Sequence, residues 1–339
     1  MILAPLLLLA SLPLATHETG GMRHAAMILP ARFEAGRVFV VPRTRDGQEL
    51  RLYTDTGGGL FLDERAVERL KLATTAAPAG SDAPPGAKLA SLPRFAPGFA
   101  IPAPLGNGGS LFVVPAARAE KQAKQGIGGD GMLGEAWFAG RVWTWDYPGR
   151  RLVVNGAGWT RASGTKRVVL GFKTSADGKR ETNFPRMRIR VDGKPIDVLL
   201  DTGATTVLTP HAMKALNDDL PAERATSMIV DEQFQAWRKR HPDWRVIDDA
   251  QQGSHAAMIE VPEVEIAGYR IGPVWFTWRP DANFHKFMSG FMDRQVEGAI
   301  GGNALEHFVM TIDYPDAAAY FECTRDCNRG AFPKPRSEP

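Results

Sequence analysis

Asp55 and Asp201 each open an Asp-Thr-Gly triplet at the end of a strand-like run. A carboxylate at a tight turn between buried strands is costly unless it is hydrogen-bonded or functional. The glycine of each triplet lets backbone N–H groups approach that carboxylate. Two carboxylates in contact resist double ionisation and share one proton, so one can act as a base and the other as an acid on a single water. The two triplets are thus candidates for such an acid–base pair; the alternative for each is an ordinary turn at the end of a strand.

The triplets belong to a pattern that occurs twice along the chain. Each follows an Asp-Gly hairpin signal between apolar-alternating runs and precedes a helix-like segment. The paired segments are Asp46-Gly47 and Asp192-Gly193, 63–70 and 210–216, 131–138 and 298–305, and 143–148 and 310–315. The copies are offset by 146 residues at the aspartates (201 − 55) and by 167 at the later motifs (301 − 134). The chain is therefore an internal duplication whose second copy is 21 residues longer (167 − 146).

These motifs resemble the lobe of the aspartic peptidases. In each copy Asp-Thr-Gly is followed downstream by two apolar residues and a glycine, at 132–134 and 299–301. Two lobes in one chain resemble the pepsin-like plan, whereas Ala204 after the second triplet is similar to the retroviral-type, or retropepsin-like, lobe. The resemblance covers about 37–321. It implies a mostly β, bilobal acid-protease fold with two pseudo-twofold-related, β-barrel-like lobes and few short helices.

The length of 339 residues suits two domains at ~150 residues each. The expected divisions are a signal peptide or apolar segment over 1–21, an N-terminal retropepsin-like lobe over 22–158, a linker over 159–166, a C-terminal lobe over 167–322 and a tail over 323–339.

The resemblance implies that Asp55 and Asp201 are the catalytic dyad of an aspartic endopeptidase. It also implies a peptide or protein substrate, no cofactor, no metal and a two-lobed monomer. The supporting residues are Thr56, Gly57, Thr202 and Gly203 in the turns, and Leu133, Gly134, Ile300 and Gly301 behind them.

Two departures from the family pattern bear on activity. Gly58 stands where a small hydroxyl residue or alanine is usual, so the first triplet is followed by a weaker match than the second, which is followed by Ala204. The Pro-rich stretch 73–106 is where the flap over the substrate is expected, yet no tyrosine lies between Asp55 and Leu133. The flap is therefore expected to be of the retroviral kind or degenerate.

The longer second copy predicts an insertion over 218–253. It contains a helix-like segment, 231–240, and two tryptophans, Trp237 and Trp244. We expect these tryptophans to belong to the local core; the alternative is a lid over the cleft.

The N-terminal segment 1–15 is apolar and uncharged, and too short to span a bilayer, which needs ~20 residues. It is interpreted as a signal-peptide core, although no basic residue precedes it; the alternative is a buried strand. The two cysteines, Cys323 and Cys327, favour a small disulfide loop in an oxidising compartment. Together these features predict a periplasmic or secreted protein.

Several other classes are disfavoured by the sequence. The net charge of +3 is small and dispersed, so it does not favour nucleic-acid binding. The seven histidines show no metal-ligand spacing. The glycine motif at 126–131 follows a polar, helix-like segment instead of a strand, so it is interpreted as a loop and not as a dinucleotide site.

Two alternatives to the peptidase remain open at this stage. One is a non-catalytic peptide-binding module on the same fold, because fold alone does not establish activity. The other is a structural protein of the cell envelope.

Overall fold

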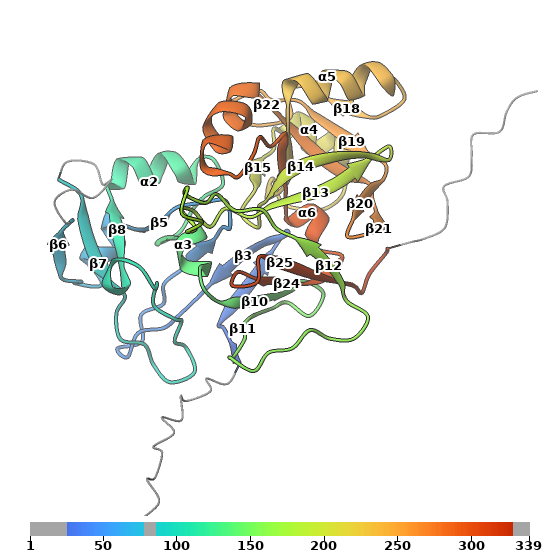
Figure 1. Cartoon of the computed structure of the whole chain (residues 1–339). Helices are drawn as coiled ribbons and strands as arrows, with labels where there is room; N and C mark the ends of the chain where they lie inside the picture. Colours follow the sequence, from blue (N-terminus) through green and yellow to red (C-terminus); the bar gives the residue numbers. More distant parts are fainter. Residues whose placement is uncertain (1–25, 78–85, 328–339) are drawn as a thin grey trace, which may run out of the picture.

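The computed structural model describes residues 26–77 and 86–327, so the predicted signal segment 1–21 and the end of the C-terminal tail lie outside the described residues. The protein is mostly β, with few short helices; in Figure 1 the N-terminal lobe lies toward the lower left and the C-terminal lobe toward the upper right. Within the described ranges, no helix is both long and apolar enough to cross a membrane.

The elements of the first half are β1 (Met27–Ile28), β2 (Ala31–Glu34), β3 (Arg37–Val40), β4 (Leu52–Thr54), β5 (Leu60–Asp63), α1 (Glu64–Arg69), β6 (Thr74–Ala76), β7 (Lys88–Ser91), η1 (Asn107–Gly109), β8 (Ser110–Val114), α2 (Ala116–Ala123), β9 (Gly131–Leu133), α3 (Glu135–Phe138), β10 (Val142–Asp146) and β11 (Arg151–Val154).

The elements of the second half are β12 (Lys166–Val169), β13 (Arg186–Val191), β14 (Lys194–Leu200), β15 (Thr205–Val207), α4 (Pro210–Leu216), β16 (Glu223–Ala225), β17 (Ser227–Val230), α5 (Asp231–Arg240), β18 (Val246–Ile247), β19 (Met258–Val261), β20 (Val264–Ile266), β21 (Tyr269–Ile271), β22 (Val274–Arg279), η2 (Ala282–Phe287), η3 (Met288–Phe291), β23 (Gly298–Ile300), α6 (Gly302–Leu305), β24 (Phe308–Asp313) and β25 (Ala318–Cys323).

Each lobe is built on one large sheet. The N-terminal sheet has the strand order β2-β3-β4-β9-β5-β8-β7-β6, and the C-terminal sheet has the order β18-β19-β22-β17-β23-β14-β13-β20-β21. The two predicted hairpins are present as β3–β4 and β13–β14. Asp192 and Gly193 both have positive φ, 52° and 72°, which is the backbone of a tight hairpin turn. The predicted segments 63–70, 210–216 and 231–240 are confirmed as α1, α4 and α5.

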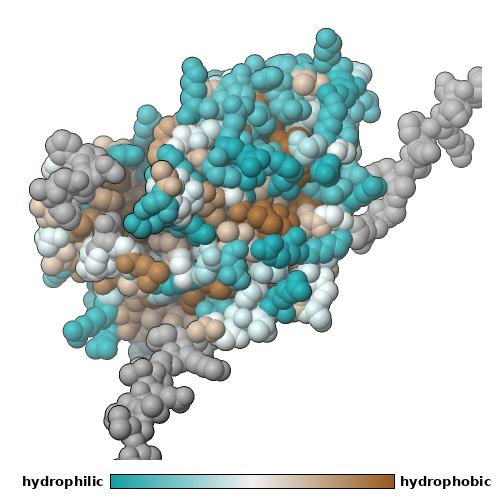
Figure 2. Space-filling model, viewed as in Figure 1, coloured by the Kyte–Doolittle hydropathy of each residue, from teal (hydrophilic) through white to brown (hydrophobic). Residues whose placement is uncertain are grey.

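A third, six-stranded sheet joins the lobes in the order β1-β11-β10-β24-β25-β12. Its central pair, β10 and β24, comes from the two copies of the repeat, and Thr144 meets Thr311 there with their hydroxyl oxygens 2.7 Å apart. Aromatic side chains, among them Trp143, Trp145 and Tyr314, are fully buried beneath this sheet. Figure 2 shows hydrophilic side chains over most of the upper lobe on the face viewed.

The strand ladders place the extra 21 residues at a different point from the one expected. β5 and β17 occupy the same place, antiparallel to β9 and β23 and parallel to β8 and β22. Their first residues are 167 apart (227 − 60). The backbone N–H of Thr226 donates to the carbonyl of Ala204, so the chain leaves and returns at one point. The insertion is therefore 205–225, which forms β15, α4 and β16, and the predicted bounds 218–253 are wrong.

This register also corrects the pairing of the helices. Because α5 follows β17 as α1 follows β5, the counterpart of α1 is α5, and the predicted equivalence of 63–70 with 210–216 is wrong. Trp237 on α5 is buried against Phe276, and Trp244 packs on Trp237. The expectation that these tryptophans are local core is thus confirmed, and the lid alternative is wrong.

Candidate active site

The two Asp-Thr-Gly turns have the same local structure. β4 delivers Asp55 and β14 delivers Asp201, and the backbone N–H of each aspartate donates to the last residue of the neighbouring strand, Leu133 or Ile300, at 3.1 and 3.0 Å. Oδ1 of each aspartate accepts the N–H of the glycine two residues later, at 2.8 Å in the first turn and 2.9 Å in the second. The local hydrogen bonds therefore hold each carboxyl over its own turn.

The threonines tie the two turns to each other. The backbone N–H of Thr202 donates to Oγ1 of Thr56 at 2.9 Å, and the N–H of Thr56 donates to Oγ1 of Thr202 at 3.2 Å. Oγ1 of Thr56 also donates to the carbonyl of Leu200 at 2.6 Å. Both threonines are fully buried, so water does not compete for these bonds.

The glycines let each carboxyl lie against the opposite turn. A Cβ on Gly203 would stand 2.1 Å from Cγ of Asp55, and a Cβ on Gly57 would stand 2.8 Å from Cγ of Asp201. Only glycine leaves that space free. The structure thus brings Asp55 and Asp201 together across the lobe boundary, with Asp55 buried and Asp201 partly exposed.

The electrostatics of the pair are asymmetric. Burial, the charge of Asp201 and a hydrogen bond to Asp201 raise the pKa of Asp55 well above its usual range. Burial also raises the pKa of Asp201, but the hydrogen bond from Asp55 and the N–H groups of Gly203 and Ala204 oppose the rise. The pair therefore retains a proton at a pH where an isolated aspartate is ionised, and the surroundings favour the proton on Asp55 and the charge on Asp201.

The predicted backing residues lie directly behind the turns. Leu133 and Ile300 are fully buried and pair in parallel with the strands that lead to the two aspartates. A Cβ on Gly134 would lie 2.1 Å from the carbonyl oxygen of Gly58. A Cβ on Gly301 would lie 1.9 Å from that of Thr226, the residue that follows the insertion.

The dyad lies in a cleft of about 1130 Å³ between the lobes. One wall carries Lys121, Lys124 and Ile127 from α2 and the glycine loop, which follows the helix as expected; the other carries 251–254 and Arg279. A smaller hollow of about 320 Å³ continues from Asp201 over Leu199, Met228, Phe284, Phe287 and Met288. The predicted flap stretch 73–106 forms β6 and β7 on either side of the undescribed residues 78–85. None of its described residues lines either hollow.

The site lies where the two lobes meet. Each lobe supplies one Asp-Thr-Gly turn, and a shared sheet joins the lobes. The fold is therefore mostly β and bilobal, with few short helices.

Comparison with solved structures finds aspartic proteinases among the similar chains. An aspartic proteinase from Irpex lacteus is 11% identical, covers 88% of this chain and 98% of its own, and has a TM-score of 0.45. Conglutin gamma, a basic 7S globulin from lupine seeds, is 11% identical over 89% of this chain and 95% of its own, with a TM-score of 0.46. A retropepsin-like aspartic protease from Rickettsia conorii is 15% identical over 48% of this chain and 94% of its own, with a TM-score of 0.26. No protein-family model and no curated protein matches the sequence.

Sequence reasoning missed Arg279, which lines both hollows beside Asp201. The signal available was a charged residue at the end of a mostly apolar strand, directly before Pro280. In the described ranges, no group of three or more His, Cys, Asp or Glu residues is arranged to hold a metal ion.

Proposed function

We propose that the protein is an aspartic endopeptidase that hydrolyses peptide bonds with a water activated between Asp55 and Asp201. The carboxylate of Asp201 accepts a proton from this water as its oxygen attacks the scissile carbonyl carbon. The protonated carboxyl of Asp55 donates its proton to the carbonyl oxygen. The resulting gem-diol collapses when Asp201 returns a proton to the amide nitrogen, which leaves as an amine, and Asp55 recovers its own proton from the diol.

The observation that carries this proposal is the reciprocal pair of hydrogen bonds between the two turns. Because each threonine binds the opposite backbone, neither aspartate can move without the other, and the two carboxyls stay in contact. A preorganised acid and base of this kind is what the chemistry requires. A peptide-binding module on the same fold would need the cleft but not a shared proton.

The direct test is cleavage of a peptide library by wild type, Asp55→Asn and Asp201→Asn, with and without pepstatin. We expect each substitution to lower kcat/KM by about 10²-fold or more, and pepstatin to inhibit the wild type. Asp46→Asn, an exposed carboxylate remote from the cleft, is the control and should retain activity. No new termini with any library peptide would favour the non-catalytic binding module or the envelope protein. Retained activity in Asp55→Asn would show that the first lobe is structural.

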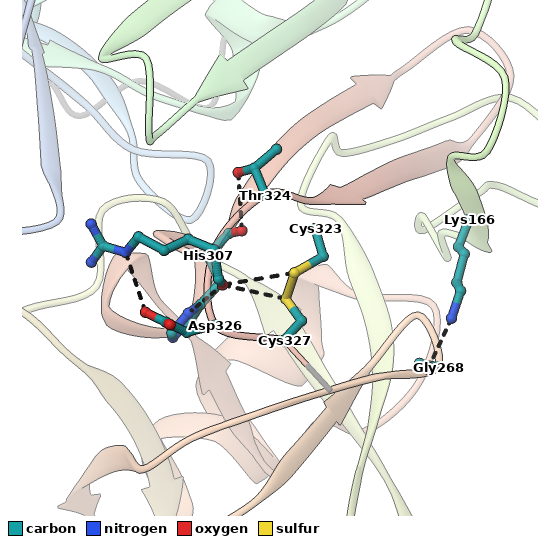
Figure 3. The surroundings of a disulfide bond; sticks show 8 residues. Lys166, Gly268, His307, Cys323, Thr324, Asp326 and Cys327 are labelled. Carbon is teal, nitrogen blue, oxygen red and sulfur yellow. Dashed lines mark hydrogen bonds and ion pairs between the residues drawn. A yellow bond between two sulfur atoms is a disulfide. The ribbon is translucent and has the colours of Figure 1, made fainter. Parts of the chain in front are cut away.

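We further propose that the chain acts as an exported monomer, periplasmic or secreted. The support for a monomer is that one chain supplies both Asp-Thr-Gly turns. The support for export is the disulfide between Cys323 and Cys327, whose surroundings appear in Figure 3. Oxidising compartments preserve such bonds. Alkylation of the denatured, unreduced protein, followed by mass spectrometry, should find neither thiol modified. Two freely alkylated cysteines in protein isolated from its native compartment would rule the bond out.

A further inference from the structure

Within the described residues, Nη1 is the guanidinium nitrogen of Arg279 that is hydrogen-bonded. Nη1 donates to Oε1 of Gln251 and to the carbonyl of Trp278, each at 2.8 Å. Within the described residues, Nε and Nη2 make no hydrogen bond and the side chain has no ion pair. Neither atom is among the buried side-chain atoms that lack a partner. The Nε–Nη2 edge is therefore an accessible donor pair on an anchored group, a geometry that matches a carboxylate.

The position of Arg279 relates it to the dyad. It lines the main cleft together with Asp55 and Asp201, and it lines the smaller hollow together with Asp201 and Asn283. It therefore stands where the two hollows meet, on the C-terminal side of the cleft. Asn283 is exposed there and adds an uncharged amide beside the guanidinium.

Arg279 is not a counter-ion of the dyad. Burial alone lowers its pKa to about 10, and no carboxylate opposes that shift. Among the groups that shift the pKa of Asp55 or Asp201, Arg279 does not occur. The cation thus bears a desolvation cost that no anion in the described structure offsets, and an incoming carboxylate would offset it.

The other charged groups of the cleft would not repel a bound anion. Glu223, the acid of the insertion that lines the cleft, is paired with Arg37 of the other lobe. Lys124 is exposed and paired with Glu120, and Lys121 is an exposed cation on the same helix. Apart from the dyad, which retains one proton, no unpaired acid among the lining residues would repel a substrate carboxylate.

The pseudo-twofold relation shows that this cation exists on one side only. Val114 pairs with the last residue of β5 as Arg279 pairs with the last residue of β17, and proline follows both. The N-terminal counterpart of Arg279 is thus a buried valine. No guanidinium therefore occupies the equivalent position in the N-terminal lobe, and Arg279 makes the two halves of the cleft chemically different.

We propose that the Nε–Nη2 edge of Arg279 binds a substrate carboxylate, either an acidic side chain near the scissile bond or the carboxyl terminus of the peptide. This inference rests on the proposed peptidase function, since it names the substrate class of the same cleft. Arg279 is a specificity-determining residue in this assignment and takes no part in proton transfer.

The test uses hexapeptides in matched pairs. In one set, a single position at a time is Glu or Gln; in the other, the same peptide ends in a carboxylate or a carboxamide. The wild type should prefer the acidic member of at least one set by about tenfold or more in kcat/KM. The set that shows the preference identifies whether a side chain or a terminus binds.

The variants then assign the preference to Arg279. Arg279→Gln should abolish it by slowing only the acidic peptides, with the neutral peptides within about twofold of wild type and the pH profile unmoved. Arg279→Glu should favour the corresponding Lys peptides. Lys124→Gln, which removes another cation of the cleft, should keep the preference. A wild type that does not distinguish the pairs, or a preference that survives Arg279→Gln, would overturn the inference.

A binding measurement separates this inference from the proposed function. Calorimetric titration of the same hexapeptides into Asp55→Asn should show the acidic preference without turnover, and Arg279→Gln in that background should remove it. If the wild type cleaves nothing while the binding preference persists, the peptidase proposal fails and the carboxylate site stands. If cleavage occurs without any acidic preference in binding or turnover, the carboxylate site fails and the peptidase stands.

Discussion

The hydroxyl of Thr56 makes two buried hydrogen bonds to the opposite turn, whereas the hydroxyl of Thr202 makes one. Thr56 accepts from the backbone N–H of Thr202 at 2.9 Å and donates to the carbonyl of Leu200 at 2.6 Å. Thr202 accepts from the N–H of Thr56 at 3.2 Å. The threonine of the first copy therefore contributes more of the hydrogen bonding between the two turns than the threonine of the second.

This asymmetry predicts unequal costs for equivalent substitutions. Thr56→Val preserves volume but leaves the Thr202 N–H unsatisfied, and should lower the free energy of unfolding by about 1–3 kcal/mol. It should also lower kcat by about tenfold or more, because the two carboxyls are no longer held in a fixed position relative to each other. Thr202→Val should cost less in both measurements, and Thr56→Ser, which keeps the hydroxyl, should stay near wild type. If the two valine variants lost equal free energy of unfolding in urea, the larger contribution of the Thr56 hydroxyl would be contradicted.

The pH profile of activity should be bell-shaped, because a coupled pair must hold one proton. Position 204 carries no hydroxyl donor, and a donor to the ionised form lowers a pKa. The optimum is therefore expected at mildly acidic pH, roughly 4–6.5. Ala204→Ser should shift the acid limb to lower pH, since Asp201 is the carboxylate. An unmoved limb in initial-rate measurements would remove the hydroxyl argument.

The same substitution at the other turn should fail for a steric reason. A Cβ at Gly58 would lie 2.5 Å from Oδ2 of Asp55 and 2.5 Å from the sulfur of Met132. Gly58→Ser should therefore displace the Asp55 carboxyl and reduce kcat by about 10²-fold instead of shifting the pH limb. Gly58→Ala is the matched control, because it adds the Cβ without a hydroxyl and should reduce kcat similarly. A fully active Gly58→Ala would show that Asp55 has room to adjust.

The dyad should destabilise the fold as pH rises. Because the pKa of Asp55 is raised in the folded state, that state keeps its proton at pH values where the unfolded chain has lost it. The free energy of unfolding then decreases as pH rises from the unfolded pKa, ~3.9, through the raised folded pKa. Asp55→Asn removes this site, so its stability should increasingly exceed that of wild type across this window.

Asp177 supplies a control of opposite sign. A hydrogen bond from Ser175 lowers its pKa, so its stabilisation is present above the unfolded pKa and lost as pH falls. Asp177→Asn should therefore be less stable than wild type at neutral pH, and the difference should vanish in acid. The measurement is chemical denaturation of both variants and wild type at several pH values. Parallel curves for Asp55→Asn and wild type would count against a raised pKa.

The insertion 205–225 should contribute to the joining of the lobes. Its Glu223 pairs with Arg37, whose buried Nη1 also donates to the carbonyl of Gly126 at 3.2 Å. Glu223→Gln leaves a buried cation without its anion and should lower the free energy of unfolding by about 1–2 kcal/mol, discounted because Glu223 is partly exposed. Glu49→Gln, which breaks a more exposed pair with Arg32, should cost under about 1 kcal/mol. Equal small losses would show that the interlobe pair is screened like a surface pair.

Local sequence patterns were enough to predict several hairpins and helices of the fold. The alternation of apolar residues around Asp192-Gly193 predicts a hairpin because a tight turn and a half-buried strand are local properties. The helices at 63–70 and 210–216 begin at capping residues, Asp63 and Thr209, which accept N–H groups of the first turns. The helix at 231–240 has no side-chain cap, and its local residue pattern alone indicated it. The duplication of Asp-Thr-Gly likewise indicated that Asp55 and Asp201 form a pair.

Tertiary structure alone decided which repeated segments are equivalent and what surrounds the dyad. Both β15 with α4 and β17 with α5 match the pattern of β5 with α1, and only the hydrogen bond from Thr226 to Ala204 and the ladder to β23 select the second. Strand pairing joins residues far apart in the chain, so local pattern cannot choose between two candidates of similar periodicity. The close approach of Asp55 and Met132 to Gly58 arises in the same way, from atoms that only the folded chain brings together. So does the position of the Nε–Nη2 edge of Arg279 in the cleft.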